Sequence, residues 1–465
     1  NITDPSVLTK GDIVVDTVTA GLTIEGIGND ATLNGFGLVL KNCSNVEIRN
    51  LGFMNCNSSE GDNCGLQQNN NHIWVHNCDF FYGDAGSDAD QAKGDGALDT
   101  KTSTFITHSY NHFWDSGKCN LQGMKSETAE NYITYHHNWY DHSDSRHPRI
   151  RTCSVHCYNN YFDGNSKYGI GVTMGASCFA ENNYFRNCKY PMLISEQGSD
   201  VATGGTFSGE SGGIIKSFGN IITGGKAFVP YSENNSDFDA YDASSADEKI
   251  GSGIKAKSGS AVYNNFDTSS IMYSYTPDNA DDVPAIVSAK AGRVDGGDFK
   301  WTFDNSVDDE SYDVNSALKS ALSSYKSSVQ SIGSGFKEDS STAPVITTKP
   351  SPAAVTTTAK PSSPTPTQTS IAPVQPVSGG YNHNFTSDGT SSSFYSITGN
   401  LSSSKGSAEY NGQTLTQCLK LESSTSVSFT APSSGKLTLV FGDAGSTVKL
   451  DGNKLTADSN GILTI

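Results

Sequence analysis

The sequence predicts an all-β chain in which residues 1–336 form a parallel β-helix and residues 379–465 form a small C-terminal β-sandwich module. Three observations predict this fold class. Short runs of Val, Ile, Tyr and Phe alternate with segments rich in Asn, Ser, Thr, Gly and Asp, and helix-forming patterns are scarce. One strand-like segment recurs along the first 266 residues. A Ser/Thr/Pro-rich tract then separates this region from the C-terminal module.

The recurring segment ends on an aromatic or aliphatic residue, at intervals of 27, 33, 27, 22, 23, 37 and 44 residues. Its copies span 48–53, 75–80, 108–113, 135–140, 157–162, 180–185, 217–222 and 261–266. Two residues before the end, successive copies carry asparagine: Asn111, Asn138, Asn160, Asn183, Asn220 and Asn264. Asparagine side chains at a turn can hydrogen-bond from one coil to the next. The pattern favours a parallel β-helix with inserted loops; the alternative is a β-sandwich whose asparagines fall in phase by chance.

The chain divides into three parts. Residues 1–336 contain the repeat and, over 314–336, a pattern that predicts a short helix and a tail packed on the coils. Residues 337–378 are rich in Ser, Thr, Pro and Ala and predict an extended, flexible linker. Residues 379–465 regain strand-like alternation, with strands expected over 426–430 and 436–441. This organisation is typical of extracellular polymer degraders, because a second module raises the effective concentration of an enzyme on its polymer.

The net charge of −18 belongs to residues 1–336, because the linker (+1) and the C-terminal module (−1) cancel. So acidic a protein argues against nucleic acid as a partner, and an acidic substrate would need a bridging cation or a local basic cluster. The sequence has no apolar run long enough to span a membrane. It begins at Asn1, which fits either a processed secreted protein or a trimmed chain, and we expect an extracellular protein that acts as a monomer.

Nine of the ten cysteines lie within the first 190 residues, and the tenth is Cys418. Their spacing does not match that of a zinc site. In an oxidising compartment we expect some of them to form disulfide bonds.

Carboxylates gather at the start of the segment from residue 94 to residue 151. Asp95 and Asp99 lie four residues apart beside glycines. Such a pair can bind calcium, act as an acid/base pair, or cap turns. Asp62 lies about one coil earlier and can stack near them.

Three cations follow in successive coils: Lys118, Arg146 and Arg151. Neighbouring strands lie about 4.8 Å apart, so residues at a similar phase of successive coils come close together. The cations either form a structural salt-bridge cluster with the carboxylates or line a groove for a sugar carboxylate, to which arginine gives bidentate contacts.

Four ordered motifs resemble polysaccharide lyase family 1, the pectate lyases. They are Asp-Gly-Ala-Leu-Asp-Thr-Lys at 95–101, Thr-His-Ser-Tyr-Asn-His-Phe-Trp-Asp-Ser-Gly-Lys at 107–118, Tyr-His-His-Asn-Trp-Tyr at 135–140 and Arg-His-Pro-Arg-Ile-Arg at 146–151. The resemblance covers roughly residues 10–270. It implies a right-handed parallel β-helix and calcium-dependent β-elimination of polygalacturonate. The chain departs from the family pattern at 74–77, where Trp-Val-His-Asn stands for Trp-Ile-Asp-His on the expected calcium side.

The resemblance also implies a role for each candidate residue. The calcium ligands would be Asp62, Asp95 and Asp99. Lys118 resembles the lysine that contacts the substrate carboxylate, Arg146 the Brønsted base, and Arg151 a second substrate-binding arginine. The C5 proton of galacturonate is weakly acidic, so calcium and Lys118 would neutralise the neighbouring carboxylate in the transition state. Because arginine is ordinarily protonated, the base role of Arg146 rests on the resemblance.

Three motifs in the C-terminal module, at 383–386, 419–423 and 448–452, resemble a family 77 carbohydrate-binding module. The resemblance implies binding of weakly esterified homogalacturonan through lysines. The candidate lysines are Lys405, Lys420 and Lys449. The module has no tryptophan, which argues against stacking on flat cellulose.

The residues and the resemblance together predict a secreted pectate lyase that cleaves α-1,4-linked polygalacturonate to unsaturated oligogalacturonides with Ca²⁺ as cofactor. Pectin lyase, which acts on methyl-esterified pectin without calcium, is an alternative whose site should be less charged and more aromatic. A non-catalytic β-helix pectin-binding protein is another, and it would not need Asp95, Asp99, Lys118 and Arg146 in this order. A polygalacturonase shares the fold but cleaves by hydrolysis.

Overall fold

The computed structural model describes residues 5–84, 92–326, 383–390, 392, 395–404, 408–410, 413–420, 425–429, 437–443, 445–450, 453–459 and 461–464. The chain divides into two compact units, Asn1–Ala343 and Pro344–Ile465. The division falls inside the predicted linker, 337–378, all of which lies outside the described residues. No helix among the described residues is long and apolar enough to cross a membrane.

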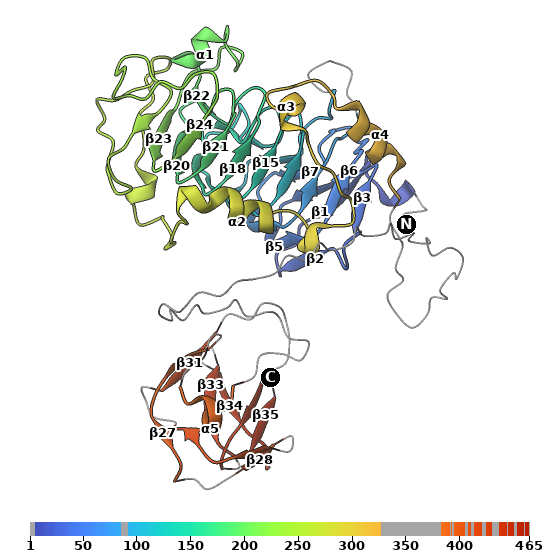
Figure 1. The fold of residues 1–465 in the computed structure, drawn as a ribbon, viewed down its shortest axis with the longest axis vertical. Helices are drawn as coiled ribbons and strands as arrows, with labels where there is room; N and C mark the ends of the chain where they lie inside the picture. The colour runs from blue at the N-terminus through green and yellow to red at the C-terminus, as the bar shows by residue number, and fades with distance from the viewer. Residues whose placement is uncertain are drawn as a thin grey trace, which may run out of the picture. The chain divides into compact units, whose positions relative to one another are not determined.

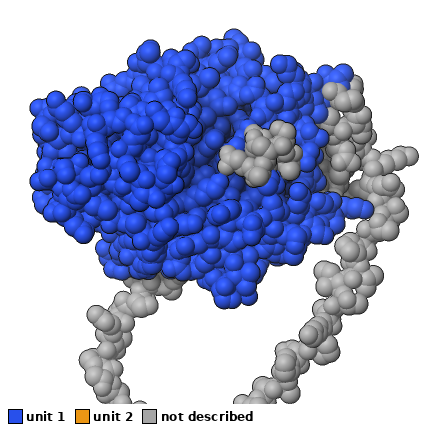
Figure 2. All heavy atoms as spheres, turned by 90° about the horizontal axis from the view of Figure 1, so that it is seen from above, with its two compact units in different colours: residues 1–343 blue, residues 344–465 orange. Residues whose placement is uncertain are grey.

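The first unit is a parallel β-helix, as the sequence repeat predicts (Figure 1). Successive strands enter three parallel sheets in turn, so that through most of the unit each strand pairs with the third strand after it. The surface of this unit, blue in Figure 2, is hollowed on the face in view.

We name the three sheets A, B and C. Sheet A contains β1 (Asp12–Asp16), β4 (Gly37–Lys41), β7 (Cys64–Gln67), β10 (Leu98–Lys101), β13 (Leu121–Gln122), β16 (Arg149–Arg151), β19 (Ile170–Thr173) and β22 (Met192–Ile194). Sheet B contains β2 (Leu22–Glu25), β5 (Ser44–Arg49), β8 (Asn71–His76), β11 (Thr104–Ser109), β14 (Tyr132–His136), β17 (Ser154–Tyr158), β20 (Ser177–Glu181), β23 (Ile214–Phe218) and β25 (Tyr241–Asp242). Sheet C contains β3 (Thr32–Asn34), β6 (Gly52–Met54), β9 (Asp79–Phe80), β12 (His112–Trp114), β15 (Trp139–Asp141), β18 (Tyr161–Asp163), β21 (Tyr184–Arg186) and β24 (Ile221–Thr223).

The aromatic residues that end the sequence repeat stack on one another inside the coils. The series runs through Phe53, Phe80, Phe113, Tyr140, Phe162 and Phe185. Successive ring centroids lie 5.0, 5.0, 5.0, 5.2 and 4.2 Å apart. Because burying one large apolar side chain contributes about 2 kcal/mol, this aromatic ladder stabilises the stack along its length.

The predicted asparagine ladder is confirmed through five of its six members. The side-chain amides of Asn111, Asn138, Asn160 and Asn183 each donate to the carboxamide oxygen one coil on, at 3.1, 2.9, 3.0 and 2.9 Å. The prediction is wrong for Asn264, whose amide donates to Glu130 and Ser154. The segment 261–266 leaves the stack, and the last strand of sheet B is β25 instead.

The expected disulfide bonds are absent, because all ten cysteines are free. Nine of them are buried. Cys157 and Cys178, on neighbouring coils, have Sγ atoms 3.9 Å apart, which is well beyond bonding distance. Buried thiols of this kind pack as small apolar side chains, and they fill the interior of the coils.

Short helices follow or flank the coils of the first unit. They are η1 (Pro5–Val7), α1 (Ser199–Ala202), η3 (Phe266–Thr268), η4 (Ala280–Asp282), α2 (Val283–Lys290), η5 (Val294–Gly296), α3 (Asn305–Asp308) and α4 (Ser316–Ser324). The helix predicted within 314–336 is α4, which lies beside β3 and β6 in Figure 1. Its Leu318 and Leu322 pack with Phe81 and Tyr82, so this helix is anchored on the early coils. The predicted tail over 327–336 lies outside the described residues.

Among its described residues, the second unit is all-β apart from one short helix, α5 (Phe385–Asp388). Its strands form five antiparallel pairs: β26 (Ser396–Thr398) with β31 (Ser426–Ser428), β27 (Leu401–Ser402) with β30 (Cys418–Leu419), β28 (Ala408–Tyr410) with β29 (Gln413–Leu415), β32 (Thr438–Val440) with β35 (Ile462–Thr464), and β33 (Thr447–Leu450) with β34 (Asn453–Thr456). Strands were predicted near β31 and β32, and both are present.

Candidate active site

The predicted site residues lie on sheet A or just before its strands. Gly96, Lys118 and Ser145 form consecutive parallel β-bridges, so they lie side by side on three successive coils. Asp95 precedes the first of these residues and Arg146 follows the last. The structure therefore brings together the carboxylate, the lysine and the arginine that the sequence singled out.

Asp62 and Asp99 converge over Gly96. A Cβ atom at residue 96 would lie 2.5 Å from Asp99 Oδ1 and 2.6 Å from Asp62 Oδ1. Both aspartates are buried. The Gly96 N–H donates to Asp62 Oδ1 at 3.1 Å, and the Leu121 N–H donates to Asp99 Oδ1 at 2.9 Å. The two carboxylates can approach residue 96 this closely because glycine has no Cβ atom.

Negative charge on this carboxylate pair is unfavourable without a cation. Burial, and then the charge of Asp99, raises the pKa of Asp62 well above its usual value. Burial also raises the pKa of Asp99, against the opposing charges of Lys101 and Arg146. A bound cation would stabilise the ionised form of both carboxylates.

Lys101 is a cation that the sequence analysis missed. Its Nζ atom lies 3.1 Å from Asp62 Oδ2 and 3.9 Å from Asp99 Oδ2. Burial lowers the pKa of Lys101, but the charges of Asp99 and Asp62 outweigh burial and raise it. The sequence could have indicated this residue: Lys101 follows Asp99 by two residues on β10, and side chains two residues apart on a strand lie on the same face.

Asp95 is more exposed than the other two carboxylates and faces Lys118. Its side chain is 30% exposed, and Lys118 Nζ lies 3.3 Å from its Oδ1 atom. Gly61 packs closely against it, because a Cβ at residue 61 would lie 3.0 Å from Asp95 Cβ. Asp95 is therefore next to the loop that carries Asp62. Within the described part of the chain, however, no three His, Cys, Asp or Glu side chains form a compact metal cluster.

The chemistry of these donors suits a calcium ion. Carboxylate oxygens are the ligands that Ca²⁺ prefers, and the ion tolerates flexible geometry with several oxygens. Asp62 and Asp99 each bring a carboxylate oxygen close to Gly96, and the exposure of the Asp95 side chain gives access from solvent. The residues present therefore fit calcium.

Arg146 is held in an unusual backbone conformation beside this group. Its φ angle is +62°, in the left-handed region that costs energy for a residue with a Cβ atom. Its backbone oxygen accepts from the Asn120 N–H at 2.7 Å, which fixes the residue to the preceding coil. No hydrogen bond or ion pair with another described residue holds its guanidinium. Arg146 is thus fixed in its backbone while its side chain remains available.

Arg151, which the resemblance suggests as a second substrate-binding arginine, is paired with a carboxylate. Its guanidinium makes two-point contact with Glu210, at 3.0 Å from Nε to Oε2 and 2.9 Å from Nη2 to Oε1. Arg149 reaches the same carboxylate at 3.1 Å. Burial favours a high pKa for Glu210, but the Arg151 hydrogen bonds and both arginine charges lower it to about 2. Glu210 was missed because it is far from these arginines in the sequence.

We expect Glu210→Gln to lower the free energy of unfolding by about 2 kcal/mol at pH 7, because it removes hydrogen bonds between charged groups. The pKa of Glu210 is about 2 in the folded protein against an ordinary value of 4.5. Its stabilisation is therefore complete above pH 4.5 and is lost as the pH falls toward 2. Urea unfolding at pH 6 and pH 3 checks this, with exposed Glu233→Gln as the control. A difference between wild type and variant that stays constant at the two pH values would contradict it.

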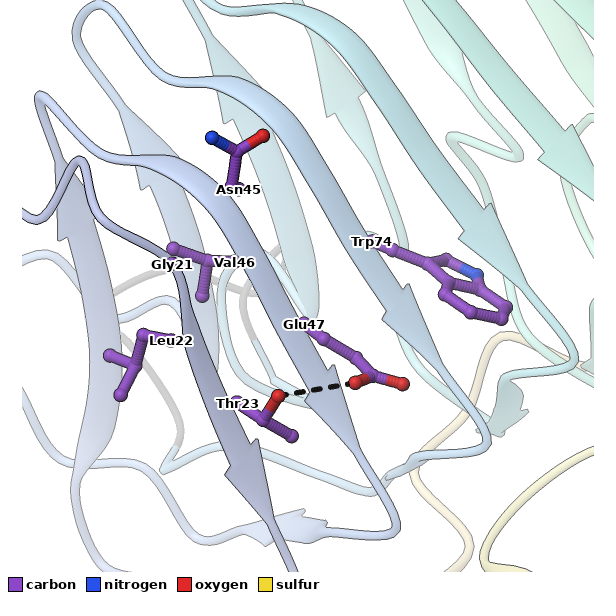
Figure 3. A pocket seen from close by; sticks show the side chains of 7 residues that line it. All are labelled: Gly21, Leu22, Thr23, Asn45, Val46, Glu47 and Trp74. Carbon is purple, nitrogen blue, oxygen red and sulfur yellow. Dashed lines mark hydrogen bonds between the residues drawn. The ribbon is translucent and has the colours of Figure 1, made fainter. Parts of the chain in front are cut away.

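The departure from the family pattern at 74–77 lies on another sheet. Trp74 and His76 are on β8 in sheet B, whereas the site residues belong to sheet A. His76 Nε2 lies 2.9 Å from Glu47 Oε1. Trp74 and Glu47 line a shallow groove over β2, β5 and β8, where Thr23 donates to Glu47 (Figure 3). The departure therefore lies on a different sheet from the candidate site residues.

The lysines predicted to bind in the C-terminal unit are partly described. Lys405 lies outside the described residues, and Lys420 and Lys449 are exposed. Lys449 on β33 is directly opposite Lys454 on β34, which is also exposed. Like charges directly opposite one another destabilise a strand pair, so such a pair suits an anionic ligand. The sequence analysis did not identify Lys454, because the sequence alone does not show which residue of β34 lies opposite Lys449.

The three sheets, the asparagine ladder and the mixed-charge cluster on sheet A define the class of pectate-lyase-like β-helices. The pectate lyase family model matches residues 9–294. The model for carbohydrate binding module 77 matches residues 379–465. The chain belongs to the pectate lyase family and carries a C-terminal module of the second family.

Three relatives illustrate this similarity. The pectate trisaccharide-lyase of Bacillus licheniformis is 34% identical over 178 residues, which are 37% of this chain and 51% of that protein. Pectate lyase II from Xanthomonas campestris is 26% identical with a TM-score of 0.46, over 63% of this chain and 82% of that one. A solved chain described with the Ruminococcus flavefaciens cellulosome is 70% identical with a TM-score of 0.17, over 18% of this chain and 70% of that one. The chain spans about half the length of the curated relatives it matches.

Proposed function

We propose that this protein is a calcium-dependent pectate lyase that acts outside the cell as a monomer. It would cleave α-1,4-linked polygalacturonate by β-elimination and release unsaturated oligogalacturonides. The observation that carries the proposal is the side-by-side placement of Asp95, Lys118 and Arg146 next to the Asp62–Asp99 pair. Membership of the pectate lyase family supports it.

The charged residues of the site can handle a sugar carboxylate. Calcium held by Asp62, Asp95 and Asp99 would supply a Lewis acid for the substrate carboxylate. Lys118 lies beside Asp95 and can donate to the same carboxylate. Lys101, next to Asp62, adds a second positive charge nearby. These fixed charges favour the negative charge that develops on the carboxylate as the C5 proton leaves.

Arg146 is the base in this proposal. Its guanidinium is not occupied by another described residue, and its backbone is fixed beside the cations. The neutral form would accept the C5 proton, and the electron pair of that C–H bond would form the C4–C5 double bond. The C4–O bond then breaks, and the departing sugar oxygen takes a proton from solvent water.

Formation of the C4–C5 double bond tests the proposal directly. Its ultraviolet absorbance is followed on polygalacturonate and on methyl-esterified pectin, with and without a calcium chelator. We expect a gain on polygalacturonate that the chelator abolishes and added Ca²⁺ restores. No gain on either polymer would contradict a lyase. Activity on methylated pectin that ignores the chelator would indicate pectin lyase, and new reducing ends without absorbance would indicate hydrolysis.

For the C-terminal module we propose binding of weakly esterified homogalacturonan through exposed lysines. The carboxylates of that polymer complement the Lys449–Lys454 pair, and Lys420 is a further exposed cation. Attachment to the polymer would raise the local concentration of the β-helix unit on its substrate.

We expect Lys449→Ala combined with Lys454→Ala to weaken binding of the intact chain to low-ester homogalacturonan about tenfold. Each exposed charge contact is worth up to about 1 kcal/mol, and salt screens it. Affinity electrophoresis at two salt concentrations measures the change. The matched control replaces both lysines by arginine, which keeps the charge and should retain the affinity. An alanine double variant that binds like the wild type would exclude this pair from the binding surface.

A further inference from the structure

A buried ion network lies beneath the site. Lys93 Nζ contacts Asp115 Oδ1 at 2.5 Å and Asp144 Oδ1 at 2.9 Å. The Tyr82 hydroxyl donates to the other oxygen of Asp115, and the Ser166 hydroxyl donates to Asp144 at 2.7 Å. Lys93, Asp115 and Asp144 are only 4, 4 and 5% exposed. We call these five residues the Lys93 network.

Each charged member of the Lys93 network comes just before one residue of the site. The pairs are Lys93 before Asp95, Asp115 before Lys118, and Asp144 before Arg146, separated by two, three and two residues. These pairs belong to three different segments that only the coiling brings together. One buried ion network therefore connects the three segments that carry the ligand, the lysine and the base.

Backbone contacts also hold these segments in place. The Asp144 N–H donates to the Ser116 oxygen at 2.9 Å. The Gly83 N–H donates to the Lys93 oxygen at 3.1 Å, and a Cβ at Gly94 would lie 2.6 Å from Gly83 Cα. This leaves little freedom at the base of the segment that leads to Asp95.

The chemistry of the Lys93 network explains why it would set geometry. Buried charges are unfavourable unless each is paired and hydrogen-bonded, so such a network accepts few alternative arrangements. An apolar cluster of the same volume could shift more easily. A displacement of about 1 Å among catalytic groups lowers rates by about a hundredfold.

We propose that the Lys93 network is a positioning device that holds Asp95, Lys118 and Arg146 in register across three coils. Lys93 is its central positioning residue and does not touch the substrate. This inference rests on the proposed lyase function of the same site.

Two lysine variants of the intact chain test the proposal. Lys93→Met removes the central charge, and Lys216→Met is its matched control. Lys216 is also buried and pairs with Asp267 at 2.7 Å, and it lies on β23 of sheet B, whereas the site residues lie along sheet A. Both proteins are compared at a temperature where circular dichroism shows them folded. We expect Lys93→Met to lower kcat about a hundredfold and to weaken the calcium Kd, measured by calorimetry without substrate, about tenfold. Lys216→Met should lose thermal stability but keep both values.

Equal losses of kcat and calcium affinity in the two variants would overturn the proposal. If Lys93→Met does not fold, Tyr82→Phe decides, because it removes a single hydroxyl from the network. We expect it to lower kcat about fivefold with KM unchanged, and an unchanged kcat would overturn the proposal. A wild type without lyase activity would instead refute the proposed function. The calcium titration would then still show whether Lys93 shapes the site.

Discussion

Replacing Arg146 by lysine is expected to lower kcat on polygalacturonate about a thousandfold, within the range that a general base contributes. Lysine keeps one positive charge, so the affinity for the anionic polymer should change little. The variant loses the guanidinium, whose position depends on the left-handed backbone of residue 146 at φ +62°. Ultraviolet absorbance of the unsaturated product gives kcat, and calorimetry with oligogalacturonate gives binding.

The matched control for this variant is Arg49→Lys. Arg49 pairs with Glu25 and Glu47 on sheet B, away from the site on sheet A. It should keep full activity. A lysine at 146 that supports turnover near that of the wild type would refute the role of Arg146 as base. Loss of polymer binding together with activity would assign Arg146 to substrate recognition instead.

Gly96→Ala is expected to abolish calcium binding. The added Cβ would lie 2.5 and 2.6 Å from the oxygens of Asp99 and Asp62, closer than real Cβ contacts. Because the obstacle is a pair of buried carboxylates, the methyl group must push them apart or occupy their shared space. We expect the calcium Kd to weaken at least a hundredfold and the chelator-sensitive activity to vanish. Calorimetry with Ca²⁺ measures the first effect, and the absorbance assay measures the second.

Gly251→Ala is the control for that variant. Its added Cβ would meet nothing within 4 Å, so calcium affinity and activity should match the wild type. If Gly96→Ala still binds calcium with wild-type affinity, the space between Asp62 and Asp99 is not the calcium site. Thermal unfolding of both variants separates a general loss of folding from a local one.

Much of the fold could be predicted from the sequence, because each coil repeats one local pattern. The aromatic residue that ends most copies and, from Asn111 onward, the asparagine two residues before the end occupy the same places in successive turns. The resulting ladders appear in the structure from Phe53 to Phe185 and from Asn111 to Asn220. The prediction for Asn264 was wrong because spacing alone does not show whether the chain is still coiling. The segment 261–266, beyond β25, matches the sequence pattern but does not pair as a strand of the three sheets.

The candidate site could be predicted only in part. Asp62, Asp99, Lys118 and Arg146 come together because all of them follow the coil repeat or lie next to it. Glu210 and Lys93 lie in segments between coils, and no periodic pattern places such segments. Their contacts with Arg151 and Asp115 depend on how each loop closes. Whether the cysteines form disulfide bonds could not be predicted from the sequence either, because disulfide pairing depends on the distances between cysteines on different coils.

Because the cysteines of this β-helix are unpaired, we expect its folding and stability not to depend on redox conditions. No covalent oxidation step separates the unfolded chain from the native coils, so thiol reductants should leave folding and unfolding midpoints unchanged. Burial raises the pKa of Cys56 to about 11 and that of Cys78 to about 12, which keeps the reactive thiolate form rare. Alkylating reagents should then modify these sulfurs only when neighbouring coils separate. The rate of thiol labelling would report how often the solenoid opens, and at which turn.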